Sequence, residues 1–244
     1  MRIERFNVGW ITSPAAVYRQ GEPPEQELRF PIPAYLIETE SERVLIDTGL
    51  HPDAIADPIA FYEHPAVGLF KLEQDRPIVE QIDPSTLTKI VVTHLHFDHV
   101  GALTLLPPGV PIYMQRRELE AGKDAEAIKR NFLYPRDYAT ALDEREPILL
   151  DGDHDLLGDG SIELLLTPGH TPGHQSVRVG EELILGVDVA HFQSTLDDRR
   201  FPSFADDFEA QGRSADRLCA LRDAGARVLP GHDPDVLAPG AVDL

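Results

Sequence analysis

The sequence predicts an α+β protein in which strands and helices form layers. Short apolar runs bounded by glycine, proline or polar turns recur along the chain, as buried strands do. Longer stretches with helical periodicity lie between them. Acids and histidines follow the ends of several of these strands, and ligand sites in layered proteins gather at that edge of a sheet.

Composition narrows the class of protein and its partners. A chain of 244 residues can bury a full core and has the size of one large domain, so we expect residues 1–244 to form a single domain. The net charge of −20 repels phosphate backbones, and no basic stripe offsets it, which argues against nucleic acid as a partner. No apolar window is long enough to span a bilayer, so no membrane association is expected.

The cellular compartment is predicted from the N-terminus and from cysteine usage. The sequence begins Met-Arg-Ile-Glu-Arg-Phe, which has no apolar core typical of a secretory signal. Cys219 is the single cysteine, so no internal disulfide can form. It falls on the apolar face of a predicted helix, as a core thiol would. We therefore expect a cytoplasmic protein.

The elements follow in order along the chain. Residues 35–38 and 43–46 predict a hairpin around a polar turn. Residues 51–85 contain five prolines, which indicates loops and short helical pieces. Residues 116–129 predict a helix.

The C-terminal half alternates between strands and a long helix. Residues 162–166 and 183–187 are apolar runs that predict buried strands. Residues 214–224 predict an amphipathic helix capped by Gly225, and residues 227–229 predict a short strand after it.

Five separated segments place an acid or a histidine just after a predicted strand. Asp47 follows residues 43–46, and the run Thr-His-Leu-His-Phe-Asp-His of residues 93–99 follows residues 89–92. His170, Asp188 and His232 follow the last three strands. Chance could produce one or two such placements, so five indicate one shared site.

These residue types predict a pair of metal ions. Buried imidazoles and carboxylates are costly without partners, and such donors suit zinc or another first-row divalent ion better than Mg²⁺ or Ca²⁺. We expect two divalent ions per chain, with zinc preferred and cobalt, manganese or iron as alternatives. Asp188 can bridge the ions, and the other donors divide between them as His94, His96 and His170 for one and Asp98, His99 and His232 for the other. Each ion then keeps an open position for a shared water, as catalytic metals do. Asp47 is assigned to fixing the tautomer of a ligating histidine.

The motifs resemble, in order, those of the metallo-β-lactamase superfamily, over residues 31–232. They are Asp-Thr-Gly at 47–49, the histidine-rich run at 93–99, Thr-Pro-Gly-His-Thr-Pro-Gly-His at 167–174, Asp188 and Gly-His-Asp at 231–233. Within the superfamily, the runs at 93–99 and 168–176 are similar to those of the N-acyl-homoserine lactone lactonases. The resemblance implies a four-layer αββα sandwich of two mixed sheets with the metals at one edge.

The resemblance also implies a reaction. A hydroxide bridging the metals would attack the carbonyl of a lactone, most simply an N-acyl-homoserine lactone, and open the ring. Asp98 would pass a proton to the departing alkoxide. We expect a metal-dependent hydrolase that acts on a small-molecule lactone or ester as a monomer or a homodimer.

One departure from the lactonase pattern bears on the substrate. Lactonases of this branch have a tyrosine three residues after the bridging aspartate, where this chain has His191. An imidazole can replace the phenol as a hydrogen-bond donor to the substrate carbonyl, so His191 is a candidate catalytic residue. Superfamily members that resemble methyl parathion hydrolase have a histidine there and cleave aryl esters or phosphotriesters, which is the alternative function. A single-iron persulfide dioxygenase is a further alternative from the same scaffold.

The remaining aromatic and histidine residues fall into three groups. His174 is expected to support a metal ligand, and Phe97 must lie beside the metals because ligands flank it. Others belong either to the pocket wall or to ordinary core, namely Trp10, Phe61, Tyr62 and Phe70. In the last group, His51 and His64 are expected at the pocket mouth or in solvent, and His154 is expected in a solvated turn.

Overall fold

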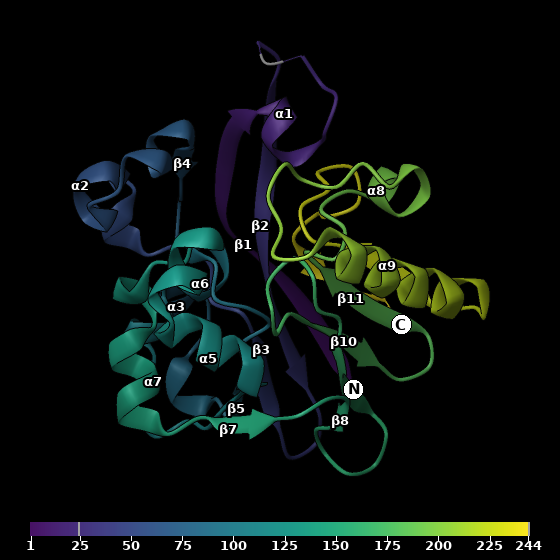
Figure 1. Cartoon of the computed structure of the whole chain (residues 1–244). Coiled ribbons are helices and arrows are strands. Elements are labelled where there is room, and N and C mark those ends of the chain that lie inside the picture. The colour runs from purple at the N-terminus through teal and green to yellow at the C-terminus, as the bar shows by residue number, and fades with distance from the viewer. Residues whose placement is uncertain (24, 244) are drawn as a thin grey trace.

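The computed structural model describes residues 1–23 and 25–243 and contains two β-sheets that face each other (Figure 1). The strands are β1 (Arg2–Pro14), β2 (Glu27–Glu38), β3 (Arg43–Ile46), β4 (Lys71–Glu73), β5 (Lys89–Val91), β6 (Ile112–Gln115), β7 (Ile148–Leu150), β8 (His154–Asp155), β9 (Ile162–Leu166), β10 (Gln175–Val179), β11 (Leu183–Val187), β12 (Arg227–Pro230) and β13 (Gly240–Ala241). The larger sheet has the order β13-β1-β2-β3-β5-β6-β7, with β4 also paired to β1, and the smaller sheet has the order β12-β11-β10-β9-β8. Both sheets are mixed, because β3, β5, β6 and β7 run parallel, as do β11 and β12, whereas the other pairs are antiparallel.

Helices cover the outer face of each sheet. The α-helices are α1 (Ala15–Tyr18), α2 (Pro58–Tyr62), α3 (Ile78–Gln81), α4 (Phe97–Val100), α5 (Arg116–Lys123), α6 (Ala125–Arg130), α7 (Ala139–Arg145), α8 (Gln193–Asp198) and α9 (Phe208–Asp223). Short 3₁₀ turns occupy Pro52–Ala54, Pro65–Leu69, Pro84–Thr86, Leu103–Leu105 and Pro135–Asp137. Helices α5 and α7 lie on the side of the larger sheet, and α8 and α9 lie on the side of the smaller one (Figure 1). No helix of the described residues is long and apolar enough to cross a membrane.

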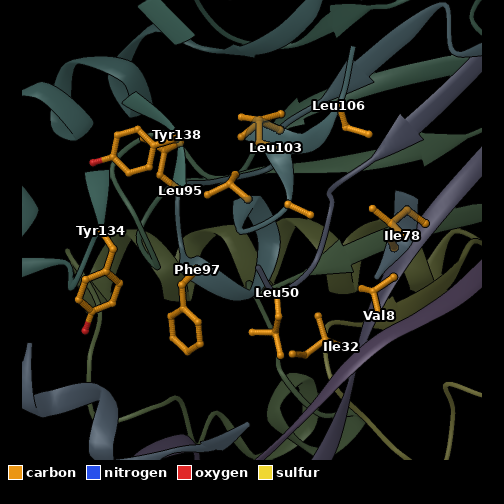
Figure 2. Close-up of a cluster of buried hydrophobic side chains, with 14 of the residues drawn as sticks. Val8, Ile32, Leu50, Ile78, Leu95, Phe97, Leu103, Leu106, Tyr134 and Tyr138 are labelled. Atoms are coloured by element: carbon orange, nitrogen blue, oxygen red, sulfur yellow. The ribbon is translucent and has the colours of Figure 1, made fainter. Parts of the chain in front are cut away.

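Three apolar clusters hold the four layers together. Between the sheets, Ile37 and Val44 of the larger sheet pack in one cluster with Leu164 and Leu185 of the smaller one. Side chains alternate along a strand, so Leu36 of β2 belongs instead to the outer cluster. That outer cluster joins the larger sheet to its helices and includes Leu95, Leu103 and Tyr138 (Figure 2). A third cluster joins α9 to β11 and β12 through Leu218, Ile184 and Val228. The predicted αββα sandwich is therefore confirmed.

The predicted elements are present, but some of their bounds differ and several further strands were not predicted. The hairpin is formed by β2 and β3, and the strands at 162–166 and 183–187 are β9 and β11. The helix predicted over 116–129 is two helices, because Asp124 is extended and its carboxylate accepts a hydrogen bond from Ala127 N, which starts α6. Helix α9 begins six residues earlier than predicted, where Asp207 caps Ala210 N. The sequence analysis did not predict the long strand β1, whose apolar residues are interrupted by charged ones, or the shorter strands β6, β7 and β10, and β2 begins eight residues before the predicted strand.

The strand ends that carry the polar residues meet at one edge of the sandwich. The loops after β3 and β5 come from the larger sheet, and those after β9, β11 and β12 come from the smaller one. Two non-glycine residues at these strand ends have left-handed backbone, Asp47 with φ 58° and Val187 with φ 49°. This conformation is rare for a β-branched residue. The chain is thus forced into tight turns where the two sheets present their polar side chains.

A buried glutamate of α5 ties together two of these loops. The Glu118 carboxylate accepts hydrogen bonds from Leu95 N at 2.9 Å, Thr171 Oγ1 at 2.8 Å and Gly173 N at 2.8 Å. Leu95 belongs to the loop after β5, and the other two belong to the loop after β9. Burial raises the pKa of Glu118 to about 7, although all three hydrogen bonds act to lower it. Sequence inspection did not single out Glu118, because a glutamate in a charged helix is usually solvated.

Gly49 allows the turn after β3 to approach β1 closely. Its φ is +77°, and a Cβ added there would lie 2.3 Å from Val8 Cγ2. Gly160 has nearly the same φ, +75°, but nothing lies within 4 Å of its added Cβ. The two glycines therefore separate the cost of a left-handed backbone from the cost of a clash.

Gly49→Ala should destabilise the protein more than Gly160→Ala. The control substitution should lower the free energy of unfolding by about 1–2 kcal/mol, from backbone strain alone. At Gly49 the collision with Val8 should add roughly 1–3 kcal/mol. Urea denaturation of both variants measures the difference, and equal losses would show that β1 yields to the new side chain.

Glu118→Gln should destabilise the protein in a pH-dependent way. Even when protonated, a carboxyl group keeps two oxygens that can accept hydrogen bonds, whereas the amide has one and its NH₂ group must face a donor, so at low pH we expect a loss of roughly 1–3 kcal/mol. Because the folded-state pKa lies above the value of 4.5 for a free carboxyl, the stability contributed by Glu118 is full at low pH. It falls as the pH rises through about 4.5 to 7. Urea denaturation of the metal-loaded proteins at several pH values should therefore show that the free energies of unfolding of the wild type and of Glu118→Gln approach each other as the pH rises through this window.

Glu120→Gln is the matched control, because Glu120 is exposed on the same helix. It should leave the free energy of unfolding unchanged at every pH. A Glu118→Gln protein with wild-type stability would mean that the two loops are held without this carboxylate.

Candidate active site

The Asp188 carboxylate lies at the centre of the edge where the strand ends meet. Its Oδ2 atom is 3.3 Å from His170 Nε2, 3.5 Å from His99 Nε2 and 3.7 Å from His94 Nε2. Its Oδ1 atom is 3.2 Å from His232 Nε2. The structure therefore brings together side chains that the sequence placed after four different strands.

The first group of donor atoms comprises His94, His96, His170 and Asp188, whose ligand atoms lie within 4.8 Å of one another. All four residues are buried. His94 Nε2 is 3.1 Å from His96 Nδ1, and His170 Nε2 is 2.9 Å from the same atom.

Hydrogen bonds on the outer side of two of these rings fix their tautomers. Thr93 Oγ1 donates to Asp47 Oδ2, so it must accept from His94 Nδ1, which leaves a lone pair on His94 Nε2. His96 Nε2 donates to the carbonyl of Asn131 at 2.8 Å, which leaves a lone pair on His96 Nδ1. Two lone pairs 3.1 Å apart repel each other unless a cation lies among them. The arrangement fits a metal ion and does not fit a hydrogen-bonded network.

The second group comprises Asp98, His99 and His232, whose ligand atoms also lie within 4.8 Å of one another. His99 Nδ1 donates to Asp47 Oδ2 at 2.8 Å, and His232 Nδ1 donates to the carbonyl of Pro31 at 3.0 Å. The Nε2 atoms of both histidines point inward and have no hydrogen-bond partner among residues 1–23 and 25–243. Asp98 Oδ2 lies 3.8 Å from one and 3.6 Å from the other. Buried ring nitrogens whose lone pairs have no hydrogen-bond partner again fit a bound cation.

The site therefore has the chemistry of a two-metal centre, and Asp47 orients its ligands as the sequence predicted. The Asp47 carboxylate accepts hydrogen bonds from Thr93 and from His99. It therefore fixes the His99 ring directly and the His94 ring through Thr93. Asp188 lies between the groups, with Oδ2 near His170 and His99 and Oδ1 near His232. Oxygen and imidazole donors of this kind are the ligands of zinc and related first-row ions.

Electrostatics within the site would assist metal uptake. Burial lowers the pKa of His94 and His170 well below the usual value, so both rings are neutral as ligands must be. Burial also acts to lower the pKa of His99 and His232, but Asp188 and other nearby carboxylates outweigh it and raise both. The surplus negative charge thus attracts protons, which a divalent cation would displace.

His174 supports Asp188 from behind and is not one of the residues whose donor atoms cluster. Its Nδ1 atom donates to Thr167, 3.1 Å from the carbonyl oxygen and 3.0 Å from the hydroxyl. Its Nε2 atom accepts a hydrogen bond from the backbone N–H of Asp188 at 3.1 Å. Burial lowers the pKa of His174 to about 3, so the neutral ring holds Asp188 in position.

His191 lies beside the bridging carboxylate. Its Nε2 atom is 3.2 Å from Asp188 Oδ2, and the ring is buried. Neither ring nitrogen makes a well-aligned hydrogen bond within the part of the chain that the structure describes. His191, Asp188 and His232 also form a third set of donor atoms within 4.8 Å. The position suits a donor to a bound substrate, and it is close enough for an additional ligand.

The donor groups open onto a largely apolar pocket of about 210 Å³. Its polar base is formed by His96, Asp98, Asp188 and His191. The wall comes from segments outside the metal-binding loops, namely Val17, Tyr18, Ala66, Leu69, Phe70, Phe132, Tyr134, Ser203 and Phe204, together with Phe97. An apolar pocket with a few convergent polar groups is typical of a small-molecule site.

Only part of the predicted pocket wall is found there. Phe70 and Phe97 line the pocket, and Tyr62 packs behind them on the Phe97 ring, 5.7 Å between centroids. The other two candidates lie elsewhere, Trp10 under the guanidinium of Arg29 and Phe61 under that of Arg136.

The histidines with undecided roles have structural ones. His51 and His64 each cap a 3₁₀ turn by accepting a backbone hydrogen bond. His154 was predicted to lie in a solvated turn, but it lies in β8, half-buried, and stacks on Tyr113. Missing from the predicted site were Glu118 and the pocket residues Tyr18, Tyr134 and Phe204, which no motif marks.

Comparisons with known proteins agree with this geometry. A model of the metallo-beta-lactamase superfamily matches residues 28–185. The N-acyl homoserine lactonase AttM of Azorhizobium caulinodans is 30% identical over 92% of this chain and 91% of that protein. An N-acyl homoserine lactonase of Bacillus cereus is 32% identical over 72% of this chain and 70% of that protein.

The solved structures include one with a bound reaction product. An N-acyl homoserine lactone hydrolase with N-hexanoyl-L-homoserine at its catalytic metal centre superposes with a TM-score of 0.83. It is 26% identical to this chain, and the alignment covers 96% of this chain and 94% of that one. From the family match and the relatives together, the chain belongs to the metallo-beta-lactamase superfamily.

Proposed function

We propose that the protein is a two-metal hydrolase that opens the ring of N-acyl-homoserine lactones. The observation that carries this proposal is the position of Asp188, which lies between two groups of buried donors at the base of an apolar pocket. The relatives named as N-acyl homoserine lactonases support the choice of substrate. We further propose zinc as the metal, and a single domain, since both sheets contribute donors to one site.

The two ions would be held by the residues that the sequence singled out. One would take His94, His96 and His170, the other would take Asp98, His99 and His232, and Asp188 would bridge them. When bound, such ions act as Lewis acids that polarise a carbonyl and lower the pKa of water.

The side chains of the pocket would carry out the rest of the reaction. Hydrolysis adds one water to the lactone carbonyl, breaks the ring C–O bond and gives an alcohol and a carboxylic acid, which releases its proton to solvent and becomes a carboxylate. Asp98 lines the pocket, so its carboxylate can take the proton released by the attacking water and deliver it to the departing ring oxygen. His191 would donate a hydrogen bond from its ring to the carbonyl oxygen as negative charge develops there. The apolar wall would hold the acyl chain.

Hydrolysis of aryl esters or phosphotriesters is the second candidate, and His191 is the feature that favours it. An imidazole beside the bridging carboxylate could serve an ester or a phosphoryl oxygen as well as a lactone carbonyl. The apolar wall does not separate these substrates, because an aryl group would also fit it.

A metal count and a substrate panel should separate these functions. We expect two metal ions per chain by elemental analysis, and a kcat/KM for hexanoyl-homoserine lactone that exceeds that for p-nitrophenyl esters and paraoxon by at least about 100-fold. Chelation should abolish the activity, and Zn²⁺ or Co²⁺ should restore it. A fully metallated protein inert to every lactone would refute lactone hydrolysis. One iron per chain with oxygen consumption would instead indicate a dioxygenase.

Replacement of His191 should affect turnover without affecting the metals. His191→Phe keeps the ring and removes both nitrogens, so kcat for the lactone should fall by roughly 100-fold. His191→Tyr restores a donor and should recover much of that loss, with a shift in preference toward lactones over aryl esters. Both variants should retain two ions by elemental analysis. Loss of an ion from His191→Phe would show that His191 is a ligand and not a donor.

A further inference from the structure

Tyr18 forms part of the pocket wall next to His191, although it lies far from every metal-binding motif in the sequence. It is the last residue of α1, the single helical turn that follows β1. Its ring lies 4.5 Å from that of Phe30, 5.2 Å from that of His191 and 5.7 Å from that of Phe204, measured between centroids. The side chain is buried, so these contacts hold the ring in one place.

The hydroxyl of Tyr18 has no hydrogen-bond partner among the described residues. A buried tyrosine normally finds a hydrogen-bond partner, as Tyr138 does by donating to the carbonyl of Gly122 at 3.0 Å. Among the hydrogen bonds of residues 1–23 and 25–243, none involves the Tyr18 hydroxyl. It is also not one of the fully buried polar atoms that lack a partner, so the hydroxyl oxygen has some exposed surface. The hydroxyl therefore opens into the pocket that Tyr18 lines.

The surroundings keep this phenol in its donor form. Burial raises the pKa of Tyr18 well above its usual value, and the negative charges of Asp98 and Asp188 add to the effect. These carboxylates line the same pocket. A neutral phenol in an apolar wall can donate one strong hydrogen bond to an oxygen that gains charge.

We propose that Tyr18 is a further catalytic residue, whose phenol donates a hydrogen bond to the carbonyl oxygen of the lactone ring beside His191. The proposal rests on the lactonase function proposed above. Lactonases of this branch have a tyrosine where this chain has His191. Tyr18, from the N-terminal part of the chain, would supply a phenol in its place. No covalent bond to Tyr18 forms, and its proton stays on the phenol throughout.

Two other roles for Tyr18 lead to different results. If the ring merely packs against Phe30 and Phe204, removing the hydroxyl should change nothing. If the hydroxyl binds the amide carbonyl of the acyl chain, its loss should matter only for substrates that carry an amide. A lactone without an amide, such as δ-decalactone, therefore distinguishes the ring carbonyl from the amide.

Tyr18→Phe in the metal-loaded protein is the test. We expect kcat to fall by roughly 100-fold for both hexanoyl-homoserine lactone and δ-decalactone, with KM changed by less than about 3-fold. The metal content and the melting temperature should match the wild type, because the ring is retained. Tyr113→Phe is the matched control, since Tyr113 stacks on His154 outside the pocket, and it should keep wild-type kcat.

The outcomes separate this proposal from the proposed function. Wild-type lactonase activity with full kcat in Tyr18→Phe would overturn the role of Tyr18 and leave the lactonase intact. A loss confined to the acyl-homoserine lactone would assign the hydroxyl to the amide and overturn the proposal as well. A wild type inert to both lactones would refute the lactonase function and the role of Tyr18 together.

Discussion

The burial of one carboxylate, that of Asp188, constrains the rest of the structure. A charged group removed from water is costly unless it is paired, and Asp188 is only 2% exposed. Its partners are imidazoles that follow β5, β9 and β12. These strands belong to two different sheets, so the sheets must pack with their strand ends together for the pairing to exist. The left-handed backbone at Val187 is the local strain that accompanies this placement.

The donors would repel one another without cations, so metal binding and folding are coupled at this edge. Lone pairs of His94 and His96 face each other, and the inward nitrogens of His99 and His232 lack partners. Ions at this position would link the larger sheet to the smaller one. The hydrophobic layer between the sheets stabilises the remainder of the sandwich and does not depend on metal. The site is thus the part of the fold whose stability depends on what it binds.

The site was predictable where function depends on residue type, and less so where it depends on packing. His94 and His232 could be identified because an imidazole after a buried strand has few other uses. Glu118 and Tyr18 could not, since a helical glutamate and a tyrosine near a chain end usually have ordinary roles. Their roles here arise from contacts with residues far away in sequence, such as Gly173 and His191. The same limit applies to elements: β11 follows from an apolar run, whereas β1 contains Arg2, Glu4 and Arg5, which occupy both faces of the strand, and is not an apolar run.

The pocket wall and the donor groups come from separate parts of the chain. The donors follow strands of the sandwich, whereas the wall, apart from Phe97, is supplied by α1, the 3₁₀ turn at Pro65–Leu69 with Phe70 after it, the segment after α6 and the segment between α8 and α9. Wall residues of those segments other than Tyr18, to which we assign a catalytic role, can therefore be changed to reshape the cavity while the donor groups stay in place. This division gives the scaffold evolutionary latitude, because new specificities can be sampled one loop at a time without first losing the chemistry.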